Sequence, residues 1–137
     1  MSTYWFLAST TLLLGIGTAF GTAGAVTLHV APGGNDAWSG TPQAPNADGT
    51  DGPKASLAGA RDAVRALKAK GPLTEPVDII LADGTYALTE TLALAPEDSG
   101  TADCPITYAA APGAHPVVSG GRRITDWRQG EGGLWEA

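Results

Sequence analysis

The feature that most constrains this chain is a long polar loop between a short strand and an amphipathic helix. Residues 31–53 are dense in Gly, Pro, Asn and Asp, which favour turns. This loop is longer than an ordinary connection, so we interpret it either as a functional loop or as a packed cap. A fold that contains it has to anchor these turns beside the expected strand, residues 28–30, and the helix that follows.

Residues 56–70 are predicted to form that helix. The hydroxyl of Ser56 can accept a hydrogen bond from the free amides of the first turn, and Gly71-Pro72 ends the pattern. Apolar residues recur at helical spacing: Leu57, Ala60, Ala63, Val64 and Leu67. The helix therefore has one apolar stripe and needs a partner.

Short strands are expected to supply that partner. Residues 77–81 form a nearly continuous apolar run, which predicts a strand buried on both faces and paired in parallel. A looser extended stretch follows at 86–94, and further strands are expected at 106–109 and 116–119. No repeat of fixed period is visible, so the residues alone allow a small α+β domain as well as a solenoid.

Charge and cysteine content exclude several classes of protein. The net charge of −6 and the sparse Lys and Arg argue against nucleic acid as a partner. The single cysteine, Cys104, allows no intrachain disulfide, and we interpret it as a small buried hydrophobic residue.

The N-terminal segment has the pattern of an export signal. No Lys, Arg, Asp or Glu occurs between Met1 and Leu28, and an apolar stretch is followed by small residues that end in Ala23-Gly24-Ala25. This pattern predicts a signal peptide over residues 1–25, with cleavage between Ala25 and Val26, and a secreted protein, extracellular or periplasmic, with no membrane partner after cleavage. A basic segment before the apolar stretch is missing, so a signal anchor is the alternative.

The residues after the signal also resemble a known family. The positions P-x-G-x-D-x-x-x-G-T and G-P-[FY]-x-[ST]-[LI]-x-x-A are matched by Pro32, Gly34, Asp36, Gly40, Thr41, Gly52, Pro53, Ser56, Leu57 and Ala60. This order resembles the N-terminal signature of secreted right-handed parallel β-helix proteins, the pectate-lyase-like group, which includes glycoside hydrolases and polysaccharide lyases. Lys54 departs from it, because the group usually has an aromatic residue there, and we expect weaker packing of the loop as a result.

The resemblance implies a mainly β fold, a right-handed parallel β-helix. Residues 26–137 would be its N-terminal cap helix and first coils. A solenoid needs at least about three repeats for stability, and this chain has room for a cap and about two. We therefore expect the natural polypeptide to continue beyond Ala137, and the fragment alone to be inactive.

Few residues can be assigned to a functional site. Hydrolysis would require two carboxylates on neighbouring coils, and the candidates are ordinary turn residues: Asp83, Glu90, Glu97, Asp98 and Asp103. Oxygen ligands alternate in residues 46–52, so Asp48 and Asp51 are candidate ligands for Ca²⁺, with a plain turn as the alternative. No other cofactor is expected. Trp38 is a candidate for stacking on a sugar ring, or else packs the loop on the cap helix.

We therefore expect an exported β-helix protein whose partner is a polysaccharide or cell-wall glycan. In its complete form it would be a glycoside hydrolase or a lyase, and the hydrolase is favoured because the loop and helix pattern is most similar to β-helix glycoside hydrolases. The alternative is a non-catalytic cell-surface solenoid that functions in carbohydrate binding or adhesion.

Overall fold

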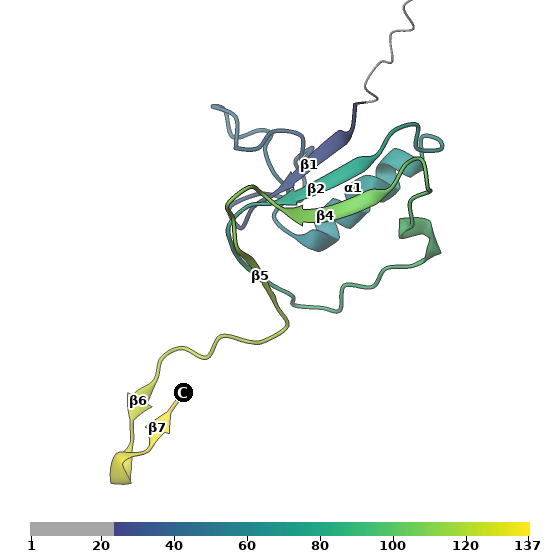
Figure 1. The fold of residues 1–137 in the computed structure, drawn as a ribbon. Helices are drawn as coiled ribbons and strands as arrows, with labels where there is room; N and C mark the ends of the chain where they lie inside the picture. Colours follow the sequence, from purple (N-terminus) through teal and green to yellow (C-terminus); the bar gives the residue numbers. More distant parts are fainter. Residues whose placement is uncertain (1–23) are drawn as a thin grey trace, which may run out of the picture.

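The computed structural model describes residues 24–137 (Figure 1). The expected signal peptide lies almost wholly outside these residues, and the expected cleavage point lies at the start of the first strand, β1 (Val26–Val30). The fold is mainly β with few helices. In the described part of the chain, no helix is long and apolar enough to cross a membrane.

The largest sheet is parallel and has three strands. Its order is β1, β2 (Val77–Leu81) and β4 (Ile106–Ala110), with Val26 paired to Val77 and Val77 paired to Ile106. The prediction of a parallel strand at residues 77–81 is therefore confirmed. The prediction that β2 is buried on both faces is wrong, because Asp78 and Ile80 on its second face are only half-buried.

A second parallel sheet lies below the first. Strand β3 (Gly84–Ala87) pairs with β5 (Pro116–Ser119), and Thr85 lies opposite Val117. The looser stretch expected at residues 86–94 is a strand only at its beginning, because the register with β5 ends at Ala87, and the last bond to β5 is from the amide of Leu88 to the carbonyl of Ser119 (2.8 Å). Its continuation includes a short 3-10 helix, η1 (Pro96–Asp98).

The C-terminal segment has a different strand direction. Strands β6 (Arg128–Gln129) and β7 (Trp135–Glu136) form a small antiparallel hairpin around η2 (Glu131–Gly133). Figure 1 shows this hairpin at the end of an extended segment, away from the two parallel sheets.

The one α-helix of residues 24–137 forms as its sequence predicts. Helix α1 (Leu57–Lys68) is capped by Ser56, whose side chain accepts a hydrogen bond from the backbone amide of Gly59. Its apolar stripe packs against the three-stranded sheet, where Ala60 and Val64 are buried. The core contains nine buried residues, namely Leu28, Val30, Leu57, Ala60, Val64, Val77, Ile79, Leu81 and Tyr86. Cys104 is also buried, as expected, but lies outside this cluster.

The long loop covers the outer edge of β1. The amide of His29 donates to the carbonyl of Gly40 (2.7 Å), and the amide of Lys54 donates to the carbonyl of His29 (2.8 Å). The loop therefore protects the edge of the first strand, as a packed cap would.

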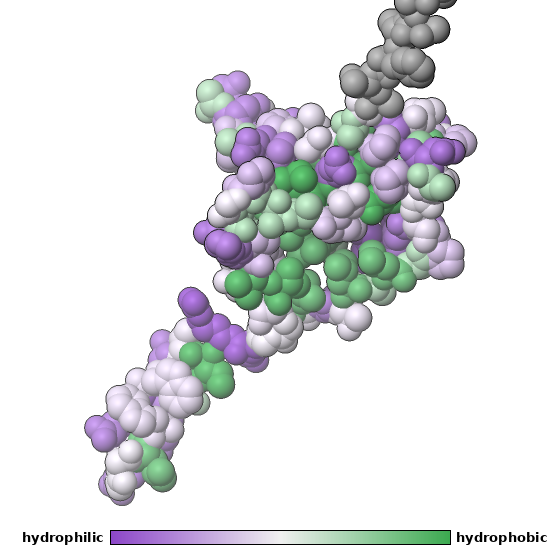
Figure 2. Space-filling model, in the orientation of Figure 1, coloured by the Kyte–Doolittle hydropathy of each residue, from purple (hydrophilic) through white to green (hydrophobic). Residues whose placement is uncertain are grey.

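Apolar surface is exposed at β5, on the side of the sheets away from β1 and the long loop. Val118 lies opposite Tyr86 in the register of β3 and β5, so both point to the same face, yet Tyr86 is buried and Val118 is 47% exposed. Figure 2 shows apolar atoms gathered on the part of the body nearest the C-terminal hairpin. In the described part of the chain, the face of β5 that continues the buried face of β3 is therefore exposed.

Candidate functional site

Asp36 anchors the long loop to the start of helix α1. Its Oδ1 accepts hydrogen bonds from the amides of Ala55 (2.8 Å) and Ser56 (3.0 Å), and its Oδ2 accepts from the Ser56 hydroxyl (2.6 Å). The same hydroxyl caps the helix through Gly59. A Cβ atom at Gly59 would overlap the Asp36 carboxylate, so the absence of a side chain at Gly59 lets this group approach the helix.

Trp38 is half-buried within the loop. A Cβ atom at Gly52 would lie 2.8 Å from its ring, so the ring packs against the Gly52 backbone. The ring thus packs the loop onto itself, where the sequence suggested packing on the helix. Stacking of Trp38 on a sugar stays a prediction.

Asp48 and Asp51 lie on the same loop but have different environments. Asp51 Oδ1 and Oδ2 accept hydrogen bonds from the amide (2.7 Å) and the hydroxyl (2.8 Å) of Ser39, and these bonds lower the pKa of Asp51. Asn46 Oδ1 accepts from the amide of Thr50 (2.8 Å). Among residues 24–137, no three His, Cys, Asp or Glu side chains gather where they could hold a metal ion, so the Ca²⁺ site stays a prediction.

Lys54 replaces the aromatic residue of the family pattern without leaving its position exposed. It is 8% exposed, its aliphatic chain packs against Gly40, and its Nζ donates to the carbonyl of Asp36 (2.9 Å). A lysine can bury its carbon chain while its ammonium group finds a polar partner. The weaker packing that we expected at this position is therefore not what the fold has.

Three of the candidate catalytic carboxylates have structural partners, and one of them, Glu97, lies 3.5 Å from the Arg65 guanidinium group. Asp83 Oδ1 accepts from the amide of His115 (3.0 Å), which joins the turns that follow β2 and β4. Asp98 accepts two hydrogen bonds of 2.6 Å from Arg65. Lys68 Nζ also donates to the carbonyls of Glu97 and Ser99 (2.8 Å to Ser99). These contacts hold η1 against helix α1.

The ion pair between Arg65 and Asp98 makes the stability of the fold depend on pH in the acidic range. The Asp98 side chain is 6% exposed, and the hydrogen bonds from Arg65 lower its pKa from 3.8 to about 2, while the pKa of Arg65 is raised. A carboxylate with a depressed folded pKa contributes stability that is present above its unfolded pKa and is lost as the pH falls through the folded value.

We therefore expect the wild-type protein to lose stability between about pH 4 and pH 2 more steeply than an Asp98→Asn variant. Thermal unfolding followed by circular dichroism across this range measures the difference. Parallel pH profiles for the two proteins would contradict the assignment. Glu131→Gln, at an exposed position of η2, is the matched control.

The lateral face of the β3–β5 sheet carries a hollow that is lined in part by basic and hydroxyl-bearing residues. It has a volume of about 520 Å³ and is lined by Thr85, Ala87, Ser119, Gly121, Arg122 and Arg123. Thr85 and Ala87 lie opposite Val117 and Ser119 in the strand register, so all four side chains point away from the core. This lateral hollow is our candidate ligand site, because its lining includes two arginines, Arg122 and Arg123, and two hydroxyl-bearing residues, Thr85 and Ser119.

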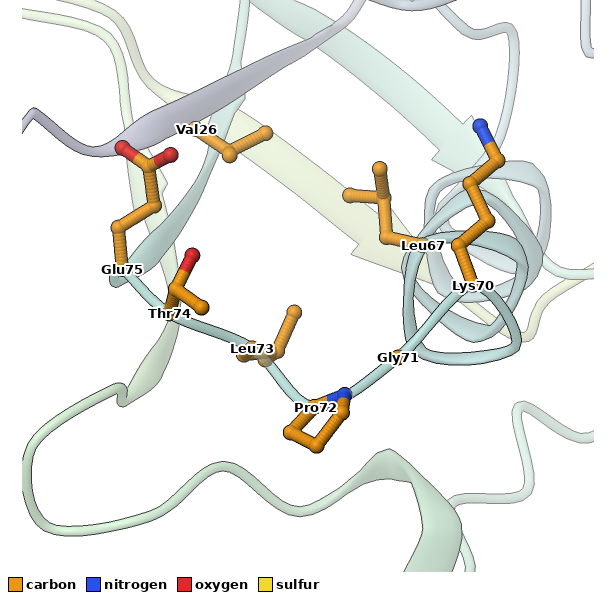
Figure 3. Close-up of a pocket in the computed structure, with 8 residues that line it drawn as sticks. All are labelled: Val26, Leu67, Lys70, Gly71, Pro72, Leu73, Thr74 and Glu75. Atoms are coloured by element: carbon orange, nitrogen blue, oxygen red, sulfur yellow. The ribbon is translucent and has the colours of Figure 1, made fainter.

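A second hollow lies at the other end of the molecule, where helix α1 ends (Figure 3). It has a volume of about 260 Å³ and is formed by Val26, Leu67 and residues 70–75. Figure 3 shows Lys70 and Glu75 on opposite sides of it. Its lining contains one residue of each charge, Lys70 and Glu75, whereas the lining of the lateral hollow contains two arginines and no acidic residue.

The sequence did not reveal the lateral hollow. Arg122 and Arg123 follow β5 directly, after Ser119-Gly120-Gly121, and adjacent arginines at a strand end are the available signal. Thr85 precedes them by more than thirty positions, so only the pairing of β3 with β5 brings the two segments together.

Comparisons with known proteins give two structural matches. No family model matches the chain, and no curated protein matches it. A solved structure named "Glycoside hydrolase" is 33% identical, with a TM-score of 0.67 over 81% of this chain and 17% of that protein. A second, "The complex structure of XylC with xylose", is 25% identical, with a TM-score of 0.53 over 80% of this chain and 14% of that protein. The chain therefore spans less than a fifth of the length of either match.

Proposed function

We propose that this chain is the N-terminal cap and the first two rungs of an exported right-handed parallel β-helix protein, which in its complete form is a glycoside hydrolase acting on a polysaccharide. The observation that carries the proposal is the similarity to a solved glycoside hydrolase over most of the chain. The parallel sheets add independent support.

The strand pairing has the pattern of stacked rungs. β2 and β3 form one rung, β4 and β5 form the next, and each strand pairs in parallel with its counterpart about 30 residues later. Parallel crossovers within one sheet are right-handed in nearly all proteins, which favours a right-handed solenoid. The uncovered interior at Val118 favours further rungs from the same polypeptide.

The proposed substrate is a glycan that contains xylose or a related sugar. One matching structure is described with xylose bound, although the match is distant. Hydrolysis requires a carboxylic acid and a carboxylate about 5 to 9.5 Å apart. Arg65 and the amide of His115 already engage Asp98 and Asp83, so we place the catalytic pair on later rungs.

The complete protein is expected to release reducing sugar from xylo-oligosaccharides, and residues 26–137 alone are expected to release none. A reducing-end assay across neutral and acidic polysaccharides measures both. Mass spectrometry of the products separates the alternatives, since a lyase leaves an unsaturated sugar at the new end. Tight glycan binding without turnover would instead indicate a carbohydrate-binding or adhesion solenoid. Either result would contradict the hydrolase.

Export is tested separately on the protein from its native source. N-terminal sequencing should begin at Val26 if the signal is cleaved where the small residues predict. Recovery of an intact N-terminus in the membrane fraction would favour a signal anchor and contradict secretion.

A further inference from the structure

Glu75 is a half-buried residue beside the start of β1. It lines the second hollow together with Val26, the first residue of that strand (Figure 3). A Cβ atom at Gly24 would lie 3.4 Å from its Oε2, so the carboxylate also faces the chain just before the strand. None of the ion pairs among residues 24–137 includes Glu75. A cation placed here would stabilise this partly buried carboxylate.

The backbone nitrogen of Val26 is fixed by the residue that follows Glu75. It donates a hydrogen bond to the carbonyl of Pro76 (2.9 Å). Cleavage between Ala25 and Val26, as the sequence predicts, hydrolyses the peptide bond that this nitrogen forms. Water adds across the bond, so Ala25 leaves as a carboxylate and Val26 keeps an α-ammonium group. The nitrogen then has three N–H donors in place of one, and a positive charge.

We propose that signal cleavage creates an ion pair between the α-ammonium group of Val26 and the carboxylate of Glu75. One N–H of the ammonium group keeps the bond to the Pro76 carbonyl, and a second donates to Glu75. Hydrogen bonds between charged groups are stronger than neutral ones, so cleavage fastens the first strand more firmly to β2. The proposal rests on the cleaved export that is part of the proposed function, and adds a structural consequence of that cleavage.

The other charged and titratable residues near this position leave Glu75 as the partner. Lys70 lies across the second hollow from Glu75 and makes no ion pair with it (Figure 3). Asp78 and His29 alternate with the buried residues of β2 and β1, so their side chains point to the other face of the sheet. Glu75 is therefore the acidic side chain at the hollow that Val26 lines.

The test uses the mature protein secreted from its complete gene, after N-terminal sequencing has identified its first residue. Mass spectrometry of the N-terminal peptide measures how fast acetic anhydride acetylates the α-amino group as the pH is raised. The midpoint of this profile is the pKa of the α-amino group, which is about 7.7 to 8.0 when unperturbed. In the wild type we expect a midpoint above that range, because the carboxylate of Glu75 favours the charged form. Burial without a partner would lower the midpoint instead.

In Glu75→Gln the midpoint is expected to return to the ordinary range, and acetylation at neutral pH is expected to be up to about tenfold faster than in the wild type. Glu131→Gln is the matched control, because it removes the same charge from an exposed position of η2, and it is expected to keep the wild-type midpoint.

The pair is also expected to protect β1 in a pH-dependent way. A group whose folded pKa is raised contributes stability that is present below its unfolded pKa and is lost as the pH rises through the folded value. Hydrogen exchange of residues 27–30 at neutral pH is therefore expected to be about fivefold slower in the wild type than in Glu75→Gln. The difference is expected to vanish above the raised pKa.

A protein that begins at Val26 with an ordinary midpoint, unchanged in Glu75→Gln, would overturn the ion pair and leave the proposed function standing. A raised midpoint that persists in Glu75→Gln would assign the ammonium group to another partner and would also overturn it. A first residue other than Val26 would overturn both the ion pair and the predicted cleavage. The reducing-end assay reports on the hydrolase independently of all three results.

Discussion

Replacing Ile79 with alanine is expected to lower the free energy of unfolding by about 3 to 4 kcal/mol. Ile79 is fully buried at the centre of β2, the middle strand of the three-stranded sheet. Its neighbours on both sides are paired strands, so the structure cannot easily collapse into the cavity that the truncation leaves. Urea denaturation followed by circular dichroism measures the loss.

The neighbouring residue provides a matched control. Ile80 is the same residue type on the same strand, but it points to the other face and is only half-buried. Ile80→Ala is therefore expected to cost about 1 kcal/mol. Equal losses for Ile79→Ala and Ile80→Ala would mean that the two faces of β2 are equally buried, which contradicts the described orientation of the strand.

Replacing Asp36 with alanine is expected to lower the free energy of unfolding by about 2 kcal/mol. The change removes the acceptor of two backbone amides and of the Ser56 hydroxyl, so the loop and the first turn of α1 lose their common anchor. Asp36→Asn keeps one carbonyl oxygen for the amides and is expected to lose less. Thermal unfolding of both variants separates the hydrogen-bonding role from the charge.

Asp48→Ala is the control for Asp36→Ala. Asp48 is an exposed carboxylate on the same loop, and no hydrogen bond or ion pair of its side chain occurs within the described region. Its removal is expected to change stability by less than about 0.5 kcal/mol. A loss at Asp48 that matches the loss at Asp36 would mean that loop charge, and not the Asp36 anchor, sets stability.

Local patterns in the sequence were sufficient for most of the elements. Helix α1 begins directly after Ser56, which caps it, and ends before Gly71-Pro72, and both signals act between residues close in the chain. The strands at residues 77–81, 106–110 and 116–119 form where short apolar runs lie between turn residues. The length of the strand expected in the weakly patterned stretch at 86–94 was overestimated, because a strand needs a partner and the register with β5 ends at Ala87.

Contacts between distant residues were not visible in the sequence. The ion pair between Arg65 and Asp98 forms because η1 packs against helix α1. The packing of Trp38 on Gly52 forms because the long loop folds back on itself. Lys54 is a position where distant contacts improved on the packing that the sequence predicted. Its residue type predicted poor packing, but the carbonyl of Asp36 accepts its ammonium group and Gly40 makes room for its carbon chain.

The sequence by itself determined the capped helix, the turn-rich loop before it and the short strands, because caps, turns and apolar spacing act over a few residues. The tertiary structure alone decided the strand register, and through it the lateral hollow. Pairing Ala87 with Ser119 places Arg122 and Arg123 beside Thr85. That pairing depends on stacking segments far apart in the chain, and no local preference of either segment specifies it.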